Sequence, residues 1–141
     1  MPTPIISISG FLCERVLREA DGVHSAIRIV DVFYVPDVPG GMMEFRALVS
    51  IKAQPGDDSE HLVDWKLENP DGTERLLDGT AKTVTFGSLL GPKVPGGANL
   101  VVHFNIPAEV LGTHFLHVLL DGEVVLTLPL TLLHPQIEET H

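Results

Sequence analysis

Histidines are the residues of this chain that could most readily carry out chemistry. The sequence contains seven of them: His24, His61, His103, His114, His117, His134 and His141. A neutral imidazole binds divalent transition metals and exchanges protons near neutral pH. His103 and His117 lie in consecutive predicted strands, so direct pairing of those strands could bring both imidazoles together. With a carboxylate they would make a divalent-metal site, the basis of a metal-dependent enzyme.

The spacing of the histidines favours a simpler interpretation. The sequence has no His-x-His and no His-Glu-x-x-His motif, the local patterns that fix two metal ligands on one element. We therefore expect scattered surface or half-buried histidines, with no metal site and no cofactor.

Acidic residues in predicted loops raise a calcium hypothesis. Asp57, Asp58 and Glu60 share one loop, Asp78 lies in another, and Asp71 lies in the turn between them. A calcium-dependent module similar to a C2 domain needs several carboxylates that converge at one end of the sandwich. In an antiparallel meander Asp71 would lie at the opposite end, so we favour solvated turn residues.

Nucleophilic catalysis has little support in the sequence. Cys13 has apolar neighbours, where a cysteine behaves as a small hydrophobic residue. No Gly-x-Ser-x-Gly motif occurs, and Gly40-Gly41 and Gly96-Gly97 precede predicted strands rather than helices. We predict that the protein is not an enzyme.

The element that positions the rest of the chain is Met42–Ala53. From Met43 onward every second residue is apolar or small, and the residues between them are mostly polar. This period of two predicts a strand with one buried face. In His61–Glu68 the same alternation places Trp65 on the buried face.

The other segments read as strands with Gly, Pro or Asp turns between them. They are Ile5–Leu12 continuing through Cys13–Glu19, His24–Val35, Thr73–Leu77, Thr83–Phe86, Leu100–Ile106, Thr113–Leu120 and Glu123–Leu133. We expect His24–Val35 to be central and covered on both faces, and Pro107–Gly112 to form one helical turn. The sequence thus predicts an all-β, antiparallel sandwich of about eight strands, immunoglobulin-like or C2-like. Residues 1–135 form its single domain and residues 136–141 a polar tail.

Charge and cysteine content limit the partners and the compartment. The formal net charge is −10, from 19 acidic and 9 basic residues, and such a field repels nucleic acid and anionic membranes. The single Cys13 cannot form an internal disulfide, and the N-terminal apolar run makes a poor signal peptide. We expect a cytoplasmic protein.

The closing hairpin carries more apolar surface than one core requires. Leu116, Val118 and Leu120 alternate toward the predicted core, and Pro129 favours an edge position. The opposite face is predicted to be an interface, covered by a second chain or by another segment. Its residues are Phe115, His117, Leu119, Val125 and Leu133.

Two stretches resemble known sequences. The segment Phe11–Phe33, with its Asp21-Gly22 turn, resembles the opening hairpin of a family of small, uncharacterised bacterial all-β proteins. The segment Gly112–Pro129 is similar to the closing hairpin of many immunoglobulin-like sandwiches, with His114 where Tyr usually stands and Leu116 where Phe usually stands. The resemblance implies a sandwich fold and no assigned activity.

These observations lead to one principal hypothesis and two alternatives. The principal hypothesis is a non-enzymatic interaction module that self-associates, for example as a dimer, or docks on another protein. The first alternative is a small-ligand or carbohydrate-binding sandwich, and the second is a metal-dependent enzyme that uses His103 and His117.

Overall fold

The computed structural model shows a β-sandwich and describes residues 5–18, 20, 23–56, 59–77, 81–88, 90–91 and 93–135. Within these residues there are ten strands and no helix. The strands are β1 (Ile5–Arg18), β2 (His24–Ile29), β3 (Val32–Tyr34), β4 (Met42–Ala53), β5 (Glu60–Glu68), β6 (Glu74–Leu76), β7 (Lys82–Thr85), β8 (Gly96–Pro107), β9 (Gly112–Leu120) and β10 (Glu123–Leu133).

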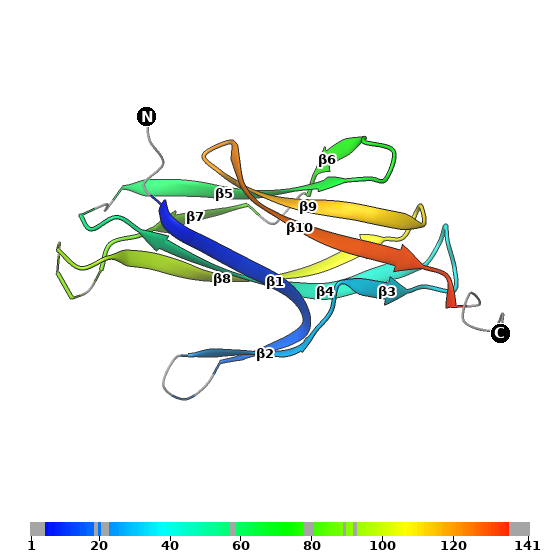
Figure 1. Ribbon diagram of the computed structural model, residues 1–141, viewed down its shortest axis with the longest axis horizontal. Helices are drawn as coiled ribbons and strands as arrows, with labels where there is room; N and C mark the ends of the chain where they lie inside the picture. Colours follow the sequence, from blue (N-terminus) through cyan, green and yellow to red (C-terminus); the bar gives the residue numbers. More distant parts are fainter. Residues whose placement is uncertain are drawn as a thin grey trace.

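Two sheets pack face to face (Figure 1). Sheet A has the order β2–β1–β4–β8. Sheet B has the order β3–β10–β9–β5–β6, and β7 also pairs with β5. The pair β3–β10 is parallel and the other pairs are antiparallel. The predicted all-β sandwich is confirmed, with one parallel pair that the sequence prediction did not include.

Strand β4 is central in sheet A, between β1 and β8. Its alternation is the predicted one, because every second residue from Met43 to Ala53 is buried against sheet B. Burial of an aliphatic or aromatic side chain contributes about 1.5–3 kcal/mol, so this one face contributes heavily to folding.

Four aromatic side chains join the two sheets across the core. Trp65 of β5 meets Phe104 of β8 edge-on, with ring centroids 5.2 Å apart. Phe104 stacks on Phe45 of β4 at 5.2 Å, and Phe45 contacts Phe33 of β3 at 5.4 Å. The inward position predicted for Trp65 is therefore confirmed, and its indole is 1% exposed.

Strand β1 has two partners along its length. Its first half pairs with β4 and its second half pairs with β2, so the β1–β2 hairpin bends away from the rest of sheet A (Figure 1). A Cβ atom on Gly10 would lie 3.0 Å from Leu126 of β10. Glycine thus permits β1 to approach β10 closely, where the two sheets meet. The predicted extension of the first strand beyond Leu12 is confirmed as far as Arg18, and the Asp21-Gly22 turn lies outside the described residues.

The prediction of one central strand over His24–Val35 is wrong. The segment divides into β2, at the edge of sheet A, and β3, at the edge of sheet B. Arg28, near the end of β2, adopts a left-handed backbone with a φ of 56°, and after Ile29 the chain crosses to the other sheet over Val30 and Asp31. Asp31 lies exposed in this crossing, and its carbonyl accepts the N–H of Thr131 at 2.7 Å.

The helical turn predicted over Pro107–Gly112 is also wrong. Residues 108–111 are irregular. Ala108 is buried, and its N–H donates to the carbonyl of Gly41 at 2.8 Å. The two ends of the segment belong to paired strands, Pro107 to β8 and Gly112 to β9, so only four residues remain to connect them.

Replacement of Trp65 tests the aromatic link between the sheets. We expect Trp65→Ala to lower the free energy of unfolding by about 3–5 kcal/mol, because the cavity would remove contacts on both sheets. The indole Nε1 is buried without a hydrogen-bond partner among the described residues. Trp65→Phe keeps a ring and removes this unsatisfied group, so it should cost less.

Urea unfolding followed by far-UV circular dichroism measures both variants, since Trp65 is the only tryptophan available for fluorescence. A loss below about 1 kcal/mol for Trp65→Ala would contradict the central position of this side chain.

Candidate functional site

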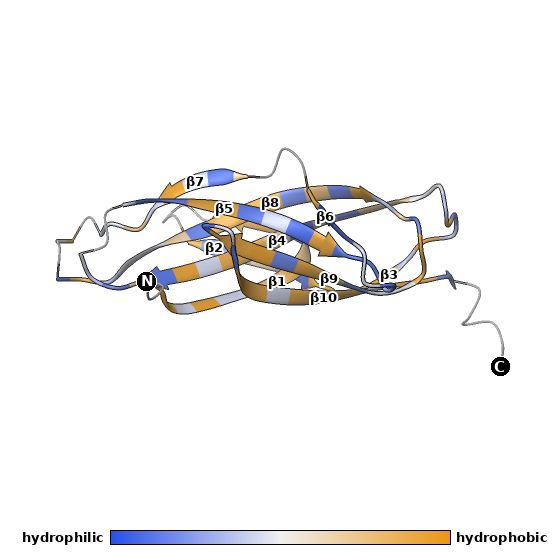
Figure 2. Ribbon diagram, turned by 90° about the horizontal axis from the view of Figure 1, so that it is seen from above, coloured by the Kyte–Doolittle hydropathy of each residue, from blue (hydrophilic) through white to orange (hydrophobic). Residues whose placement is uncertain are grey.

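The outer face of sheet B carries an apolar strip along β9, β10 and β3. Figure 2 shows β9 and β10 coloured mainly as hydrophobic, while β5 alternates and β6 is hydrophilic. We define the apolar strip by its residues, which are Val32, Tyr34, Phe115, Leu119, Val124, Pro129 and Leu133. The uncharged polar residues Thr113, Thr127 and Thr131 lie between them on the same face. None of them is charged, although the chain has a net charge of −10.

Three of the predicted interface residues belong to the apolar strip. Phe115 is 37% exposed, and Leu133 is half-buried beside Tyr34 of β3. Leu119 is only 8% exposed, because it lies between its cross-strand neighbours Asp64 and Val124. The chain thus covers Leu119 by itself and leaves Phe115 accessible.

Val125 does not belong to this face, so its predicted position is wrong. The register of β9 and β10 shifts between Val124 and Leu126, which marks a β-bulge at Val125. The extra residue reverses the alternation, and Val125 packs against the core cluster. After the bulge, Leu128 and Leu130 are buried as the core-facing residues.

Within the described part of the chain, the first half of β10 has an open backbone edge, with no hydrogen-bonded strand on the side away from β9. On that side only Thr131–Leu133 pair, with β3. The N–H of Thr131 donates toward β3, and backbone groups two residues apart point to the same side of a strand. The nitrogen of Pro129 therefore points to the open side, away from β9. Its lack of an N–H removes no hydrogen bond between β9 and β10. This confirms its predicted edge position.

A polar cluster borders the apolar strip on β5, β6 and β9. Nε2 of His117 lies 2.9 Å from Oε1 of Glu68 and 3.9 Å from Oε2 of Glu74. Nδ1 of His117 lies 2.7 Å from the hydroxyl of Thr127 on β10. Lys66 pairs with the other oxygen of Glu74 at 3.3 Å.

The structure does not bring His103 and His117 together. His103 is on β8 in sheet A and His117 is on β9 in sheet B, so the two strands do not pair. His103 points outward beside Glu44, with Nε2 to Oε2 at 3.0 Å. A site shared by these two histidines, on which the metal-dependent enzyme hypothesis depended, is excluded by this topology.

His61 connects the start of β5 to the β9–β10 turn. Its Nδ1 lies 2.7 Å from Oδ2 of Asp121, and its Nε2 lies 3.2 Å from the hydroxyl of Ser59. This is the hydrogen-bond order of a catalytic triad. The Asp121 carboxylate also accepts the N–H of Leu62 at 2.9 Å, and the imidazole stacks on Phe86. The bonds from Asp121 to two residues of β5 support a structural interpretation, in which the unit fixes the β9–β10 turn.

Among the acidic residues of the predicted loops, Asp71 lies in the described part of the chain and has a defined structural role. The carboxylate of Asp71 accepts the N–H and the hydroxyl of Thr73, and these two bonds lower the pKa of Asp71. Asp71 thus closes its own turn, as solvated turn residues do. Asp57, Asp58 and Asp78 lie outside the described residues, so the preference for solvated turn residues over calcium ligands stays a prediction for them.

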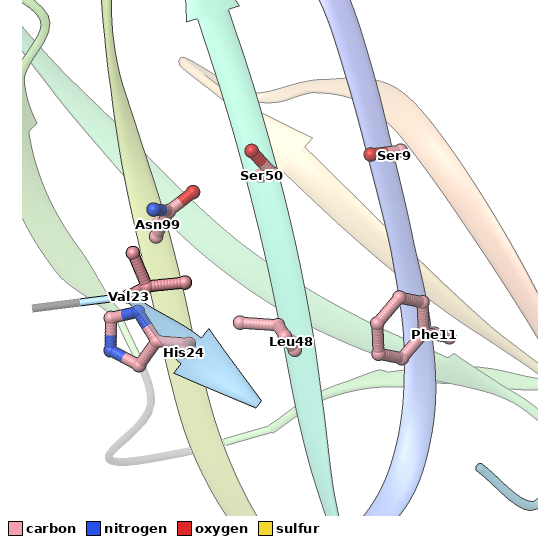
Figure 3. A pocket seen from close by; sticks show the side chains of 7 residues that line it. All are labelled: Ser9, Phe11, Val23, His24, Leu48, Ser50 and Asn99. Atoms are coloured by element: carbon pink, nitrogen blue, oxygen red, sulfur yellow. The ribbon is translucent and has the colours of Figure 1, made fainter. Parts of the chain in front are cut away.

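A groove of about 350 Å³ lies on the outer face of sheet A. The bent β1–β2 hairpin brings Val23 and His24 over the sheet (Figure 3). The remaining lining residues are Ser9, Phe11, Leu48, Ser50 and Asn99. Nδ1 of His24 is buried without a hydrogen-bond partner among the described residues, but it is shielded from solvent and therefore not presented to a ligand.

A second groove at the base of the same hairpin is charged. Its lining residues are Glu14, Arg15, Arg28, Glu44 and Arg46. Arg28 pairs with Glu14 at 3.2 Å, and Arg46 donates to the carbonyl of Glu14 at 2.7 Å. Several of these charges are therefore already compensated within the chain.

Comparison with known proteins identifies the family. The family model described as a family of unknown function, DUF6941, matches residues 8–133. The chain belongs to DUF6941. No curated protein matches its sequence. The match runs from within β1 to the end of β10 and so includes all ten strands.

A solved structure shows a similar fold at low sequence identity. It is titled "Pseudomonas fluorescens alkylpurine DNA glycosylase AlkC bound to DNA containing an abasic site analog". The TM-score is 0.53 and the identity is 13%, over 72% of this DUF6941 chain. The aligned part is 27% of the glycosylase chain. The likeness concerns the fold alone.

Sequence reasoning missed two features of this DUF6941 protein. The proximity of Glu68, Glu74 and His117 depends on the pairing of β5 with both β6 and β9, which no local motif reports. The unit of Ser59, His61 and Asp121 joins residues sixty positions apart. The Ser-x-His spacing of Ser59 and His61 was the only local sequence signal for this unit.

His114 replaces the tyrosine expected from the resemblance and makes a comparable contact. It is buried, and its Nδ1 lies 3.1 Å from the carbonyl of Gly112. Burial lowers the pKa of His114, and the nearby Arg75 acts in the same direction, while the bond to Gly112 opposes them. The folded protein therefore disfavours the imidazolium relative to the unfolded chain.

This shift predicts a pH dependence of stability. Because the folded-state pKa lies below the unfolded value of about 6.5, the His114 contribution is present above that pH and decreases as pH falls through it. In His114→Tyr this part of the dependence should be absent, since phenol does not titrate there. Urea unfolding at several pH values between about 7.5 and 5 measures the difference. Identical pH dependence of both proteins would contradict this role of His114.

Proposed function

We propose that this protein is a non-enzymatic β-sandwich interaction module that self-associates through the apolar strip of sheet B. The observation that carries the proposal is the distribution of charge. The chain has a net charge of −10, yet β10 has no charged residue from Val124 to Leu133. Two copies of an acidic protein repel one another over most of their surface, and the uncharged strip is where this repulsion is smallest.

The chemistry of the strip supports an interface more than an ordinary sandwich surface. Tyr34, Phe115 and Val124 are each more than one-third exposed, and aromatic residues are enriched in interface cores. The open edge of β10 adjoins them. A two-fold dimer is the commonest closed arrangement for such a face, because each copy offers the same surface to the other.

The size of the strip sets the expected strength of the association. Strands β10, β9 and β3 are 11, 9 and 3 residues long, so at about 3.4 Å per residue and about 4.8 Å per strand they cover on the order of 400 Å² per copy. This is below the ~800 Å² per partner of a standard stable complex. We therefore expect a weak, concentration-dependent dimer.

The strand order supports a finer proposal for the fold. β1, β4 and β8 face β10, β9 and β5, and the short β3 runs parallel to the last strand. We propose on this basis that the sandwich is immunoglobulin-like, an architecture common among interaction domains.

Charge and composition support the remaining parts of the proposal. The acidic surface argues against nucleic acid and anionic membranes as partners, so the partner is protein. Cys13 is the only cysteine and is buried as a free thiol, which suits a cytoplasmic compartment. The described residues contain no helix that is long and apolar enough to cross a membrane.

Charged substitutions in the strip test the proposed association. Phe115→Glu and Val124→Glu each place a carboxylate in the strip, where the dimer would remove it from water and bring it close to a second acidic chain, and we expect each to weaken association by at least about tenfold. Ile29→Glu is the matched control, because Ile29 is an exposed apolar residue at the edge of sheet A. Sedimentation equilibrium over a range of micromolar concentrations measures the dissociation constant.

Circular dichroism confirms that each variant is folded. A wild-type protein that stays monomeric throughout that range would refute self-association. Dimerisation that survives both strip variants and is lost with Ile29→Glu would place the interface on sheet A.

A further inference from the structure

Three potential metal ligands converge on the outer face of sheet B from three different strands. Glu68 is on β5, Glu74 on β6 and His117 on β9. One ligand atom from each lies within 4.8 Å of the other two. Glu68 and Glu74 are direct cross-strand partners, and His117 is the cross-strand partner of Lys66, two residues from Glu68. Paired strands hold the three backbones in place, so the convergence does not depend on a loop.

The distances are close to those that a small divalent ion requires. Ligand atoms at about 2.0–2.1 Å from a tetrahedral Zn²⁺ stand roughly 3.3 Å apart. Nε2 of His117 lies 2.9 Å from Oε1 of Glu68 and 3.9 Å from Oε2 of Glu74, on either side of this value. Small side-chain movements would therefore suffice to seat the ion.

Neighbouring groups orient the ligands. The hydroxyl of Thr127 lies 2.7 Å from Nδ1 of His117 and can accept its proton, which leaves the lone pair of Nε2 toward the two carboxylates. A hydrogen bond to the second ring nitrogen is the usual support of a metal-binding histidine. Lys66 lies 3.3 Å from Oε1 of Glu74, so it can stay in place while Oε2 binds the ion.

We propose that Glu68, Glu74 and His117 form a zinc-binding site. The sequence prediction of no metal considered His103 with His117 and did not include this set. One imidazole and two carboxylates match the ligands of Zn²⁺, whereas Mg²⁺ and Ca²⁺ prefer oxygen ligands alone. The His117 side chain is 13% exposed and that of Glu74 is 43% exposed, so solvent can supply the remaining ligand from the outer side. The site goes beyond the proposed self-association and does not depend on it.

Calorimetric titration of chelator-treated protein with zinc chloride at pH 7.5, and with magnesium chloride as the comparison ion, tests the site. We expect one zinc ion per chain, no magnesium binding at the same concentration, and a higher melting temperature with zinc, because a ligand that binds only the folded state stabilises it.

Three variants and two controls distinguish zinc binding at this site from zinc binding at other histidines. His117→Ala, Glu68→Gln and Glu74→Gln should each weaken zinc binding by more than about tenfold, since even outer-shell changes at metal sites have effects of that size. The exposed Glu74 can be changed without disturbing the core, so this variant remains informative if His117→Ala does not fold. His103→Ala is the matched control, because it removes a surface histidine that also contacts a glutamate.

The second control separates this proposal from self-association. Val124→Glu, designed to be monomeric, should bind zinc as the wild type does. Absence of zinc binding, unchanged binding in Glu74→Gln, or loss of binding in His103→Ala would each refute the site. None of these outcomes bears on whether the apolar strip forms a dimer.

Discussion

The aromatic contacts between Trp65, Phe104, Phe45 and Phe33 are the interaction on which the rest of the structure depends. They cross from sheet B to sheet A and back, and they fix which face of each participating strand is buried. Because side chains alternate along a strand, the burial of Trp65 turns Lys66 and Glu68 outward. The outer face of sheet B is therefore a consequence of how the core is packed.

The pairing of β5 with β9 sets the outer face of β9 as well. Trp65 pairs with Val118, and Lys66 pairs with His117. Burial of Val118 thus places His117 on the outer face, next to Phe115 on one side and the glutamates on the other. Two kinds of surface result side by side: an uncharged strip over β9, β10 and β3, and a charged cluster over β5 and β6. We infer that the first serves association and the second binds a metal ion.

The sequence predicted the features that follow from alternation within one strand. The buried faces of β4 and β5, the closing hairpin and the edge position of Pro129 all depend on local patterns, and the structure confirms them. Period-two alternation specifies a face wherever one side is buried. This is why the outward positions of Phe115 and His117 could be predicted from the sequence.

The failures arose where backbone geometry or pairing over long distances overrides the pattern. The residues His24–Val35 are apolar on both faces because they serve two sheets in turn, and the crossing at Val30 and Asp31, just after the left-handed Arg28, has no signature in a hydrophobic pattern. The bulge at Val125 reverses the alternation in a run where nearly every residue is apolar, so the sequence cannot locate it. The grouping of Glu68, Glu74 and His117 required the strand order itself.

The central claim is that copies of this protein meet through the apolar strip. The most direct measurement is a dilution series of ¹H–¹⁵N correlation spectra, in which amide shifts report the surface that changes its environment with concentration. We expect concentration-dependent shifts at Val32, Tyr34, Phe115 and Val124, with amides at the outward-facing positions Leu48 and His103 of sheet A unchanged. Shifts confined to sheet A, or spectra that do not change with concentration, would contradict it.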